Sequence, residues 1–345
     1  MSNFIAAVDL AKDVIQVCCC QNQKVLSNTD MTPPQLHAFL TTSSPMTVIF
    51  ESCATANYWY QTAQDLGHTA KLISSRLVAR IRQNQKTDRN DALAIAQAGQ
   101  MMDVRFIQGK TVRQQEYQSL VRLREQAVKQ KVALRNQLEA LLLEFNIRIS
   151  RKSGGLGGTI QSVLEEADNG FCDALRRGLY TAWQLYSQTL DALKAYDMAI
   201  EEAVQQDDAC KKLLSLESVG PINAINLYVA LLGGEAETFT RGRDVAASIG
   251  LTPVQHSSGG KTQMGSISKH ARHHTVRSYL ISGAMSVVNQ VNRRDARTGK
   301  EQWLKGVIAR RGKRCAAVAL ANKTVRTAYA ILRDGTQYKA QALVA

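Results

Sequence analysis

The chain has 345 residues, 45% of them hydrophobic, which is enough for two or three globular domains with buried cores. No stretch approaches roughly 18 uncharged apolar residues, and Asp9 interrupts the N-terminal segment, so we expect neither a membrane span nor a signal peptide. The seven cysteines form no Cys-x-x-Cys pair, which argues against a zinc ribbon and favours reduced thiols in the cytoplasm. The net charge of +14 favours a polyanionic partner such as DNA, RNA or an anionic membrane; the ordinary alternative is a merely soluble basic protein.

Charge is distributed unevenly along the chain. Residues 71–152 hold 17 basic and 7 acidic side chains, whereas residues 161–210 hold 3 basic and 10 acidic ones. Residues 241–326 return to 17 basic and 3 acidic side chains. Two basic regions that flank an acidic one predict two nucleic-acid surfaces joined by a segment that touches no nucleic acid.

Residues 1–107 read as a mixed α/β domain. Apolar runs predict five strands, namely a three-stranded meander within residues 3–27 and single strands at 47–51 and 68–74. Helical patterns are expected at residues 34–42, after two prolines, and at 56–67, after a buried strand. A third is expected at 88–99, after a charged turn.

Residues 108–212 read as a helical linker. From Val112 onward, apolar residues recur every seven positions and predict a long helix of coiled-coil type, with Leu120, Ala127, Leu134 and Leu141 on the stripe. The glycine-rich segment 153–158 predicts a flexible break. A second series follows at Leu179, Tyr186, Leu193 and Ile200. We expect an antiparallel helical hairpin, packed on itself or paired between subunits, with two ordinary bundle helices as an equal alternative.

Residues 213–345 are expected to be mainly α-helical. The segment from Ser215 to Gly234 resembles a helix–hairpin–helix, although Ser218 stands where a hairpin glycine is expected. A loop rich in glycine and serine follows, and further helices are predicted near residues 274–291 and 313–333.

Four acids stand where a catalytic metal site would need them. Asp9 and Glu51 each end a buried strand, and Asp88 and Asp91 share one face at the start of a helix. Converging carboxylates repel one another unless a cation joins them, and hard oxygen ligands suit one or two Mg²⁺ ions, with Mn²⁺ as the alternative. Metal pairs of this kind carry out phosphodiester chemistry, and a meander that opens with an acid is typical of a ribonuclease-H-like fold. Each acid alone is more commonly a cap or a helix-end charge.

The segment Ser257-Ser258-Gly259-Gly260-Lys261 is expected to be a loop that admits a phosphate backbone. A serine there is either a nucleophile or part of a loop that only binds phosphate, and the residues alone favour the second. The histidines nearby have no convincing zinc spacing. Basic side chains that could hold nucleic acid lie beside the acids and beside the loop: Lys86, Arg89, Lys261, Lys269, Arg272 and Arg277.

The motifs AVDLAK, FESCAT, KTDRNDA, SVGP and IGLTPVQHSSGGK run in order through nearly the whole chain, followed by GSISKHA and VRSYL. Together they resemble the DEDD insertion-sequence transposases, which include the Piv-type DNA invertases and members guided by a bridge or seeker RNA. Two departures are visible. Ala7 replaces a glycine often found two residues before the first acid, and Ser218 weakens the hairpin.

This resemblance implies a RuvC-like domain over residues 1–107, a coiled-coil linker over 108–212 and a transposase domain over 213–345. It implies that Asp9, Glu51, Asp88 and Asp91 are the DEDD acids and that Ser258 is the nucleophile, with Ser257 as its adjacent competitor. It further implies target and donor DNA, an element-encoded guide RNA and a homodimer that assembles to a tetramer, with each active site shared between subunits. The expected location is the bacterial cytoplasm, at the nucleoid.

Three functions compete on the sequence. The first is an RNA-guided recombinase that forms a 5′-phosphoserine link to DNA through Ser258. The second is a RuvC-type, structure-specific nuclease that needs the carboxylates and no serine. The third is a nucleic-acid scaffold in which the acids are structural.

Overall fold

A computed structural model describes residues 4–102, 104, 106–149, 154–166, 168–232, 239–267 and 274–339. The chain divides into two compact units, one made of residues 1–115, 216–218 and 227–345, the other of residues 116–215 and 219–226. The sheet region comprises residues 4–111, the helical arm residues 112–215 and the C-terminal region residues 221–339. The domain boundaries at 107 and 212 stay predictions. None of the helices in the described part of the chain is long and apolar enough to span a membrane.

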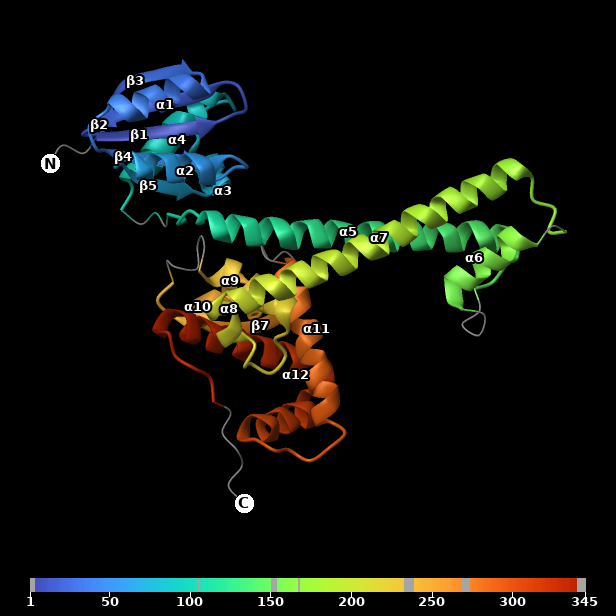
Figure 1. Ribbon diagram of the computed structural model, residues 1–345. Helices are drawn as coiled ribbons and strands as arrows, with labels where there is room; N and C mark the ends of the chain where they lie inside the picture. The colour runs from blue at the N-terminus through green and yellow to red at the C-terminus, as the bar shows by residue number, and fades with distance from the viewer. Residues whose placement is uncertain are drawn as a thin grey trace. The chain divides into compact units, whose positions relative to one another are not determined.

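The sheet region is a five-stranded mixed sheet with helices on both faces (Figure 1). Its strands are β1 (Phe4–Leu10), β2 (Ile15–Gln21), β3 (Lys24–Met31), β4 (Thr47–Glu51) and β5 (Thr69–Ile73). Its helices are α1 (Pro33–Thr42), α2 (Ala56–Asp65), α3 (Ser75–Ile81) and α4 (Asp88–Gln100). The strand order is β3-β2-β1-β4-β5, with β1, β2 and β3 antiparallel and β1, β4 and β5 parallel.

Strand alternation builds two cores in this region. Val8 and Phe50 lie in a cluster with side chains of α1 and α2. Their chain neighbours Ala7 and Ile49 lie in a second cluster with side chains of α3 and α4, because successive strand residues point to opposite faces. The predicted strands and helices are confirmed here. The short helix α3 was not expected, and β3 is longer than the sequence suggested because its exposed residues have no apolar alternation.

The helical arm contains α5 (Val112–Glu144), α6 (Gly155–Glu165), α7 (Asp173–Gln206) and α8 (Asp208–Leu213). Helices α5 and α7 run antiparallel: the hydroxyl of Tyr117 donates to the carbonyl of Ala203 (3.3 Å), and Arg124 pairs with Asp197 (2.5 Å). The expected flexible break at 153–158 is wrong from Gly155 onward, because Gly154, with φ of 80°, precedes a helix that contains Gly155 to Gly158.

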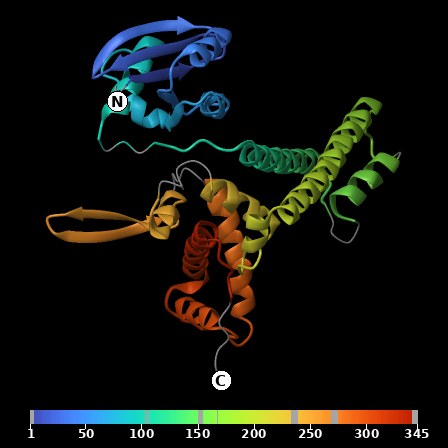
Figure 2. The same cartoon turned by 60° about the vertical axis from the view of Figure 1, so that its left-hand side comes forward.

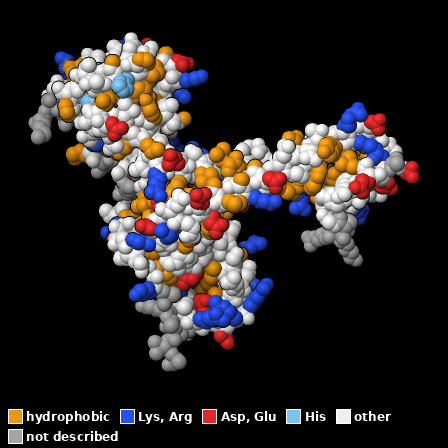
Figure 3. Space-filling model, in the orientation of Figure 1, with side chains coloured by type: hydrophobic (Ala, Val, Ile, Leu, Met, Phe, Trp, Pro, Cys, Tyr) orange, Lys and Arg blue, Asp and Glu red, His pale blue; other side chains and the backbone are white. Residues whose placement is uncertain are grey.

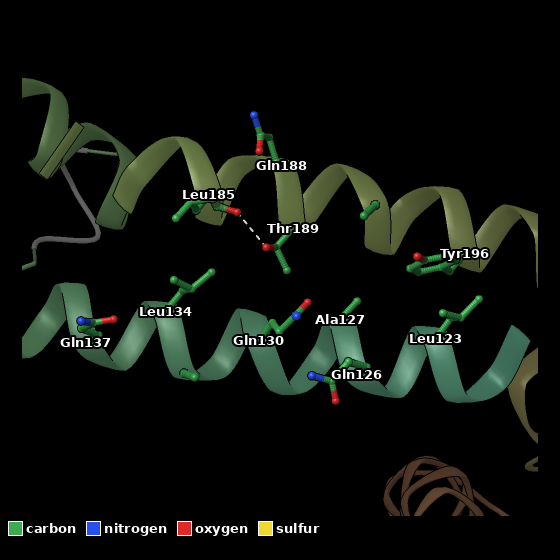
Figure 4. Close-up of a pocket in the computed structure, with 12 residues that line it drawn as sticks. Leu123, Gln126, Ala127, Gln130, Leu134, Gln137, Leu185, Gln188, Thr189 and Tyr196 are labelled. Carbon is green, nitrogen blue, oxygen red and sulfur yellow. Dashed lines mark hydrogen bonds between the residues drawn. The ribbon is translucent and has the colours of Figure 1, made fainter. Parts of the chain in front are cut away.

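Between these contacts and the tip of the arm, α5 and α7 border a cavity of about 720 Å³ (Figure 4). Apolar side chains such as Leu134 and Leu185 face it together with Gln130, and further glutamines border it. Leu123 is 53% exposed and Leu185 is 50% exposed. Hydrophobic side chains also gather on the visible surface of the arm (Figure 3). The two helices therefore leave apolar surface uncovered within one chain.

The C-terminal part of the chain contains α9 (Pro221–Leu231), α10 (Gly242–Ser248), β6 (Pro253–Ser258), β7 (Lys261–Ile267), α11 (His274–Val291) and α12 (Gly299–Asp334). The expected serine loop is wrong: β6 and β7 form a β-hairpin that projects from its neighbours (Figure 2). Gly259 and Gly260, with φ of 55° and 78°, supply the two left-handed residues of a tight turn whose twist matches that of paired strands.

Helix α12 begins fourteen positions earlier than the predicted start at 313 and includes a break. Gly312 has φ of 77° and ψ of 169°, a conformation that is essentially confined to glycine. The ammonium group of Lys323 nevertheless lies 4.6 Å from the ring centre of Trp303. In a straight helix these residues would be about 30 Å apart. Gly312 therefore lets the two parts of α12 fold back on each other.

Candidate active site

The first two predicted acids lie side by side at one end of the sheet. Strand β1 pairs in parallel with β4 through Val8 and Phe50, and Asp9 and Glu51 each follow by one residue. Adjacent strands are about 4.8 Å apart. Alternation places both acids on the face that carries Ala7 and Ile49, which is the face covered by α4.

The other two acids begin α4. The Thr87 hydroxyl accepts from the backbone N–H of Asn90 (3.3 Å) and caps the helix, so Asp88 and Asp91 fall in its first turn. Asp88 is exposed, whereas Asp91 is only 6% exposed. The guanidinium of Arg82 lies 2.5 Å from the Asp91 carboxylate.

Two polar side chains connect the start of α4 to the sheet. The amide of Gln16, which pairs with Asp9 across the strands, donates to Asn28 (2.8 Å), and Asn28 donates to the carbonyl of Arg89 (3.0 Å). Sequence reasoning missed Gln16, Asn28 and Arg82. One signal was present for Gln16, which is a polar residue within the apolar run of β2 and is 5% exposed.

Electrostatic interactions show that the four acids share one environment. Burial, together with the nearby charges of Asp91 and Asp88, raises the pKa of Asp9 to about 6. Burial also raises the pKa of Glu51, and the charges of Asp9 and Asp91 act in the same direction. The exposed Lys86 lowers both pKa values, which places its ammonium group near the same acids. Arg89 is exposed on the first turn of α4.

The donor set is that of a hard divalent cation, because all four side chains are carboxylates and carry more negative charge than their neighbours offset. Within the described ranges, no three His, Cys, Asp or Glu side chains already form a group that could hold a metal ion. Arg82 occupies Asp91, and Lys86 is near Asp9 and Glu51. These two cations therefore stand where a metal would compete for the carboxylates.

Ser258 is the last residue of β6 and pairs across the hairpin with Lys261. Ser257 pairs with Thr262 and points to the opposite face of the ribbon, because neighbouring strand residues alternate. All of these residues are exposed. The hairpin thus distinguishes the two serines, which the sequence alone does not, because only Ser258 has a cation as its cross-strand neighbour.

The remaining predicted contacts are divided between the described and undescribed residues. Arg277 lies in the first turn of α11, and His256 is exposed on β6. Lys269 and Arg272, together with His270 and His273, lie outside the described residues.

Comparison with known proteins gives a consistent result over the whole chain. A transposase family model with a DEDD domain matches residues 6–147, and a model described as "Transposase IS116/IS110/IS902 family" matches residues 210–301. The chain is 33% identical to the transposase for insertion sequence element IS1111A of Coxiella burnetii, over 98% of this chain and 92% of that protein.

Two further relatives agree. The chain is 34% identical to a probable family 20 transposase of Pseudomonas aeruginosa, over 96% of this chain and 97% of that protein. It is 29% identical to the transposase for insertion sequence element IS1328 of Yersinia enterocolitica, over 97% and 98% of the two chains. The protein therefore belongs to the DEDD transposases of the IS116/IS110/IS902 family.

Proposed function

We propose that this transposase is an RNA-guided DNA recombinase that cuts and rejoins strands through a covalent 5′-phosphoserine link at Ser258. The observation that carries the proposal is the convergence of Asp9, Glu51, Asp88 and Asp91 on one face at one end of the sheet. The strand order, the antiparallel meander and the acid on β1 support a ribonuclease-H-like, RuvC-like fold for the sheet region.

The four acids would hold one or two Mg²⁺ ions, or Mn²⁺. When bound, the metal would polarise the scissile phosphate and stabilise charge on the departing oxygen. The chain's own contribution is to hold the carboxylates in place: the strands fix Asp9 and Glu51, and the cap at Thr87 fixes the first turn of α4. The Gln16–Asn28–Arg89 connection keeps that turn against the sheet.

The serine step balances without an external energy source. The Ser258 oxygen forms a bond to phosphorus, the bond from phosphorus to the 3′ oxygen breaks, and the serine proton ends on that 3′ oxygen. A 3′ hydroxyl of a second strand then reverses the step and regenerates the serine. Lys261, as the cross-strand neighbour of Ser258, offsets the negative charge on the phosphate.

Guide RNA and DNA would contact the two basic regions, with sequence choice left to base pairing and the protein reading shape and backbone. Lys86, Arg89, Lys261, Lys269, Arg272 and Arg277 are the proposed nucleic-acid contacts. We also propose a cytoplasmic, nucleoid-associated location, because the DNA substrates lie there.

The uncovered apolar surface of the arm supports a homodimer that assembles to a tetramer. In that assembly the arms would pair as a coiled coil, and carboxylates and serine from different subunits would act on one phosphate. A monodisperse monomer with guide RNA and DNA present, measured by light scattering, would contradict the dimer.

A covalent-adduct assay tests the proposal. Purified protein, RNA transcribed from the flanking non-coding DNA, Mg²⁺ and labelled target DNA are mixed, denatured and run on a gel. We expect a labelled band at the protein's position that disappears with Ser258→Ala, with Asp9→Asn and without RNA. Ser257→Ala is the matched control and should keep the band.

Other outcomes select the competing functions. Free cleaved DNA without an adduct, unchanged by Ser258→Ala, would overturn the serine mechanism in favour of the RuvC-type nuclease. Normal recombination by Asp9→Asn would overturn the metal site as well.

A further inference from the structure

A cationic surface lies along α12, apart from the proposed catalytic residues. A groove of about 1420 Å³ runs along α12 and is bordered by α10 and by the base of the β-hairpin. Gly242 of α10 approaches the backbone of Arg326 so closely that a Cβ atom there would lie 3.4 Å from it. The hairpin contributes Pro253 and the residues from Gly265 to Ile267.

The groove is strongly positive. Six of its lining side chains are basic and, among the described residues that line it, none is acidic: Arg241, Arg243, Arg314, Lys323, Arg326 and Arg333. Arg333 pairs with Asp334 (2.7 Å). Arg241, Arg243, Arg314 and Arg326 form no ion pair with any carboxylate that the structure describes. Scattered arginines on a helix are ordinary, but a concave surface that gathers uncompensated cations attracts a polyanion.

Aromatic rings stand among these cations. The bend at Gly312 brings the half-buried Trp303 into the groove wall beneath Lys323. Tyr329 also lines the groove, and the Arg333 guanidinium lies 5.5 Å from the centre of its ring. Cations that track a phosphate backbone, interleaved with aromatic rings that stack on bases, are the pattern by which proteins bind single strands.

We propose that the α12 groove binds a single strand of nucleic acid, with phosphates on Arg241, Arg314 and Arg326 and an unpaired base against Trp303. A duplex is disfavoured because its bases are stacked on one another and unavailable to a ring in a groove wall. The inference rests on the proposed function for the source of the strand: guide RNA pairing displaces one DNA strand, and the guide itself has unpaired segments.

The groove also lies within reach of the proposed nucleophile. Gly265 lines the groove and lies four positions along β7 from Lys261, which is about 13 Å of strand. A strand held in the groove could therefore continue along the hairpin to the side of Ser258. In this arrangement the projecting hairpin would present Ser258 beside a nucleic-acid strand that the groove already holds.

Binding is measured with the full-length Ser258→Ala protein in EDTA, so that catalysis, metal and guide play no part. Fluorescence anisotropy compares labelled oligo-dT, labelled oligo-rU and a mixed-sequence DNA duplex, each about 12 nucleotides long. We expect Arg314→Gln combined with Arg326→Gln, and separately Trp303→Leu, to weaken single-strand binding about tenfold. Arg177→Gln, an exposed arginine of the arm, is the charge control and should change it less than about twofold.

Protection of a groove cysteine from chemical labelling provides a second readout. It uses the unaltered groove, so it does not depend on whether a groove variant folds. Cys315 is exposed and lines the groove, whereas the exposed Cys53 and Cys172 lie elsewhere. A bound single strand should slow maleimide labelling of Cys315 and leave labelling of Cys172, which precedes α7 of the arm, unchanged, as read by peptide mass spectrometry. The duplex should protect Cys315 less.

Unchanged Cys315 labelling at saturating single strand, or equal binding by the groove variants and the parent protein, would overturn the inference. Equal protection by duplex and single strand would overturn the preference for a single strand. The ratio of oligo-dT to oligo-rU affinity identifies DNA or RNA as the occupant. Failure of the adduct assay leaves these results untouched, so the two proposals fail separately.

Discussion

The carboxylates and the serine are carried by two different kinds of scaffold. Asp9 follows Ala7 and Val8, which are completely buried, and Glu51 follows Phe50, which is completely buried as well. Ser258 stands on a two-stranded ribbon in which every residue from Pro253 to Ser266 is exposed. The acids are therefore fixed by the core of the sheet region, whereas the hairpin has only its own backbone pairing to hold it. Substitutions should affect stability in the first scaffold and only function in the second.

The largest loss of stability is expected when the buried Asp91 carboxylate loses its ion-pair partner. Arg82→Gln leaves the buried Asp91 carboxylate without its partner and should lower the free energy of unfolding by about 3–5 kcal/mol in EDTA. Because a metal would compete with Arg82 for the same carboxylate, Mg²⁺ should restore part of that loss. Chemical denaturation with and without Mg²⁺ measures both. A loss below about 1 kcal/mol would mean that Asp91 is solvated and that the site is less rigid than described.

The second largest effect on stability is expected at the bend in α12. Gly312→Ala places a side chain where φ is 77° and ψ is 169°, which should cost about 1–3 kcal/mol and weaken the contact between Lys323 and Trp303. Gly306→Ala is the matched control, because Gly306 is helical with nothing near its Cβ position, and it should stabilise by up to about 1 kcal/mol. Thermal unfolding followed by tryptophan fluorescence separates them. Effects of the same sign would contradict the bend.

A smaller effect on stability tests the burial of Asp9 and its repulsion by Asp91 and Asp88. The folded-state pKa of Asp9 is raised from 3.8 to about 6, so folding is opposed once Asp9 ionises. The penalty is absent when the pH is below the unfolded-state pKa of Asp9 and grows as the pH rises from about 4 to 6. It is fully present when the pH is above the folded-state pKa. Asp9→Asn should therefore stabilise the metal-free protein at pH 8 and not at pH 3.5. Melting curves in EDTA at the two pH values measure this, and equal shifts at both would contradict it.

The smallest effect on stability is expected in the hairpin. Replacing Gly259 and Gly260 together by alanine removes the residues that adopt φ of 55° and 78°, so the turn and the pairing of Ser258 with Lys261 should be lost. Because the ribbon buries almost nothing, global unfolding should change by about 0.5 kcal/mol or less, while the DNA adduct disappears. A large loss of stability would show that the hairpin belongs to a core and would remove the contrast between the scaffolds.

The same contrast explains what the sequence could predict. Buried strands leave apolar runs, so residues 4–10 and 47–51 and the acids at their ends were visible. The hairpin has no buried face, so its only local signal is the Gly259-Gly260 pair, which predicts a loop open to a phosphate backbone as readily as a tight turn. Arg82 was missed because its contact with Asp91 depends on α3, a seven-residue helix with a single buried side chain.

Turn geometry explains why the sequence matches a helix–hairpin–helix imperfectly at Ser218. Ser218, which interrupts the resemblance to a helix–hairpin–helix, adopts φ of 77° and so takes the backbone conformation of the missing glycine. Its hydroxyl lies 3.3 Å from that of Thr324, 106 residues away. Such a contact depends on tertiary packing, which no local pattern records.

Mass spectrometry of the protein–DNA adduct tests the central claim most directly. The adduct formed with guide RNA and Mg²⁺ is digested with nuclease and protease, and the nucleotide-bearing peptide is sequenced. The account predicts one modified residue, Ser258, joined to a 5′ phosphate, with no such peptide from Asp9→Asn protein. A nucleotide on Ser257 or on any residue outside the hairpin, or an adduct that forms without Asp9, would contradict it.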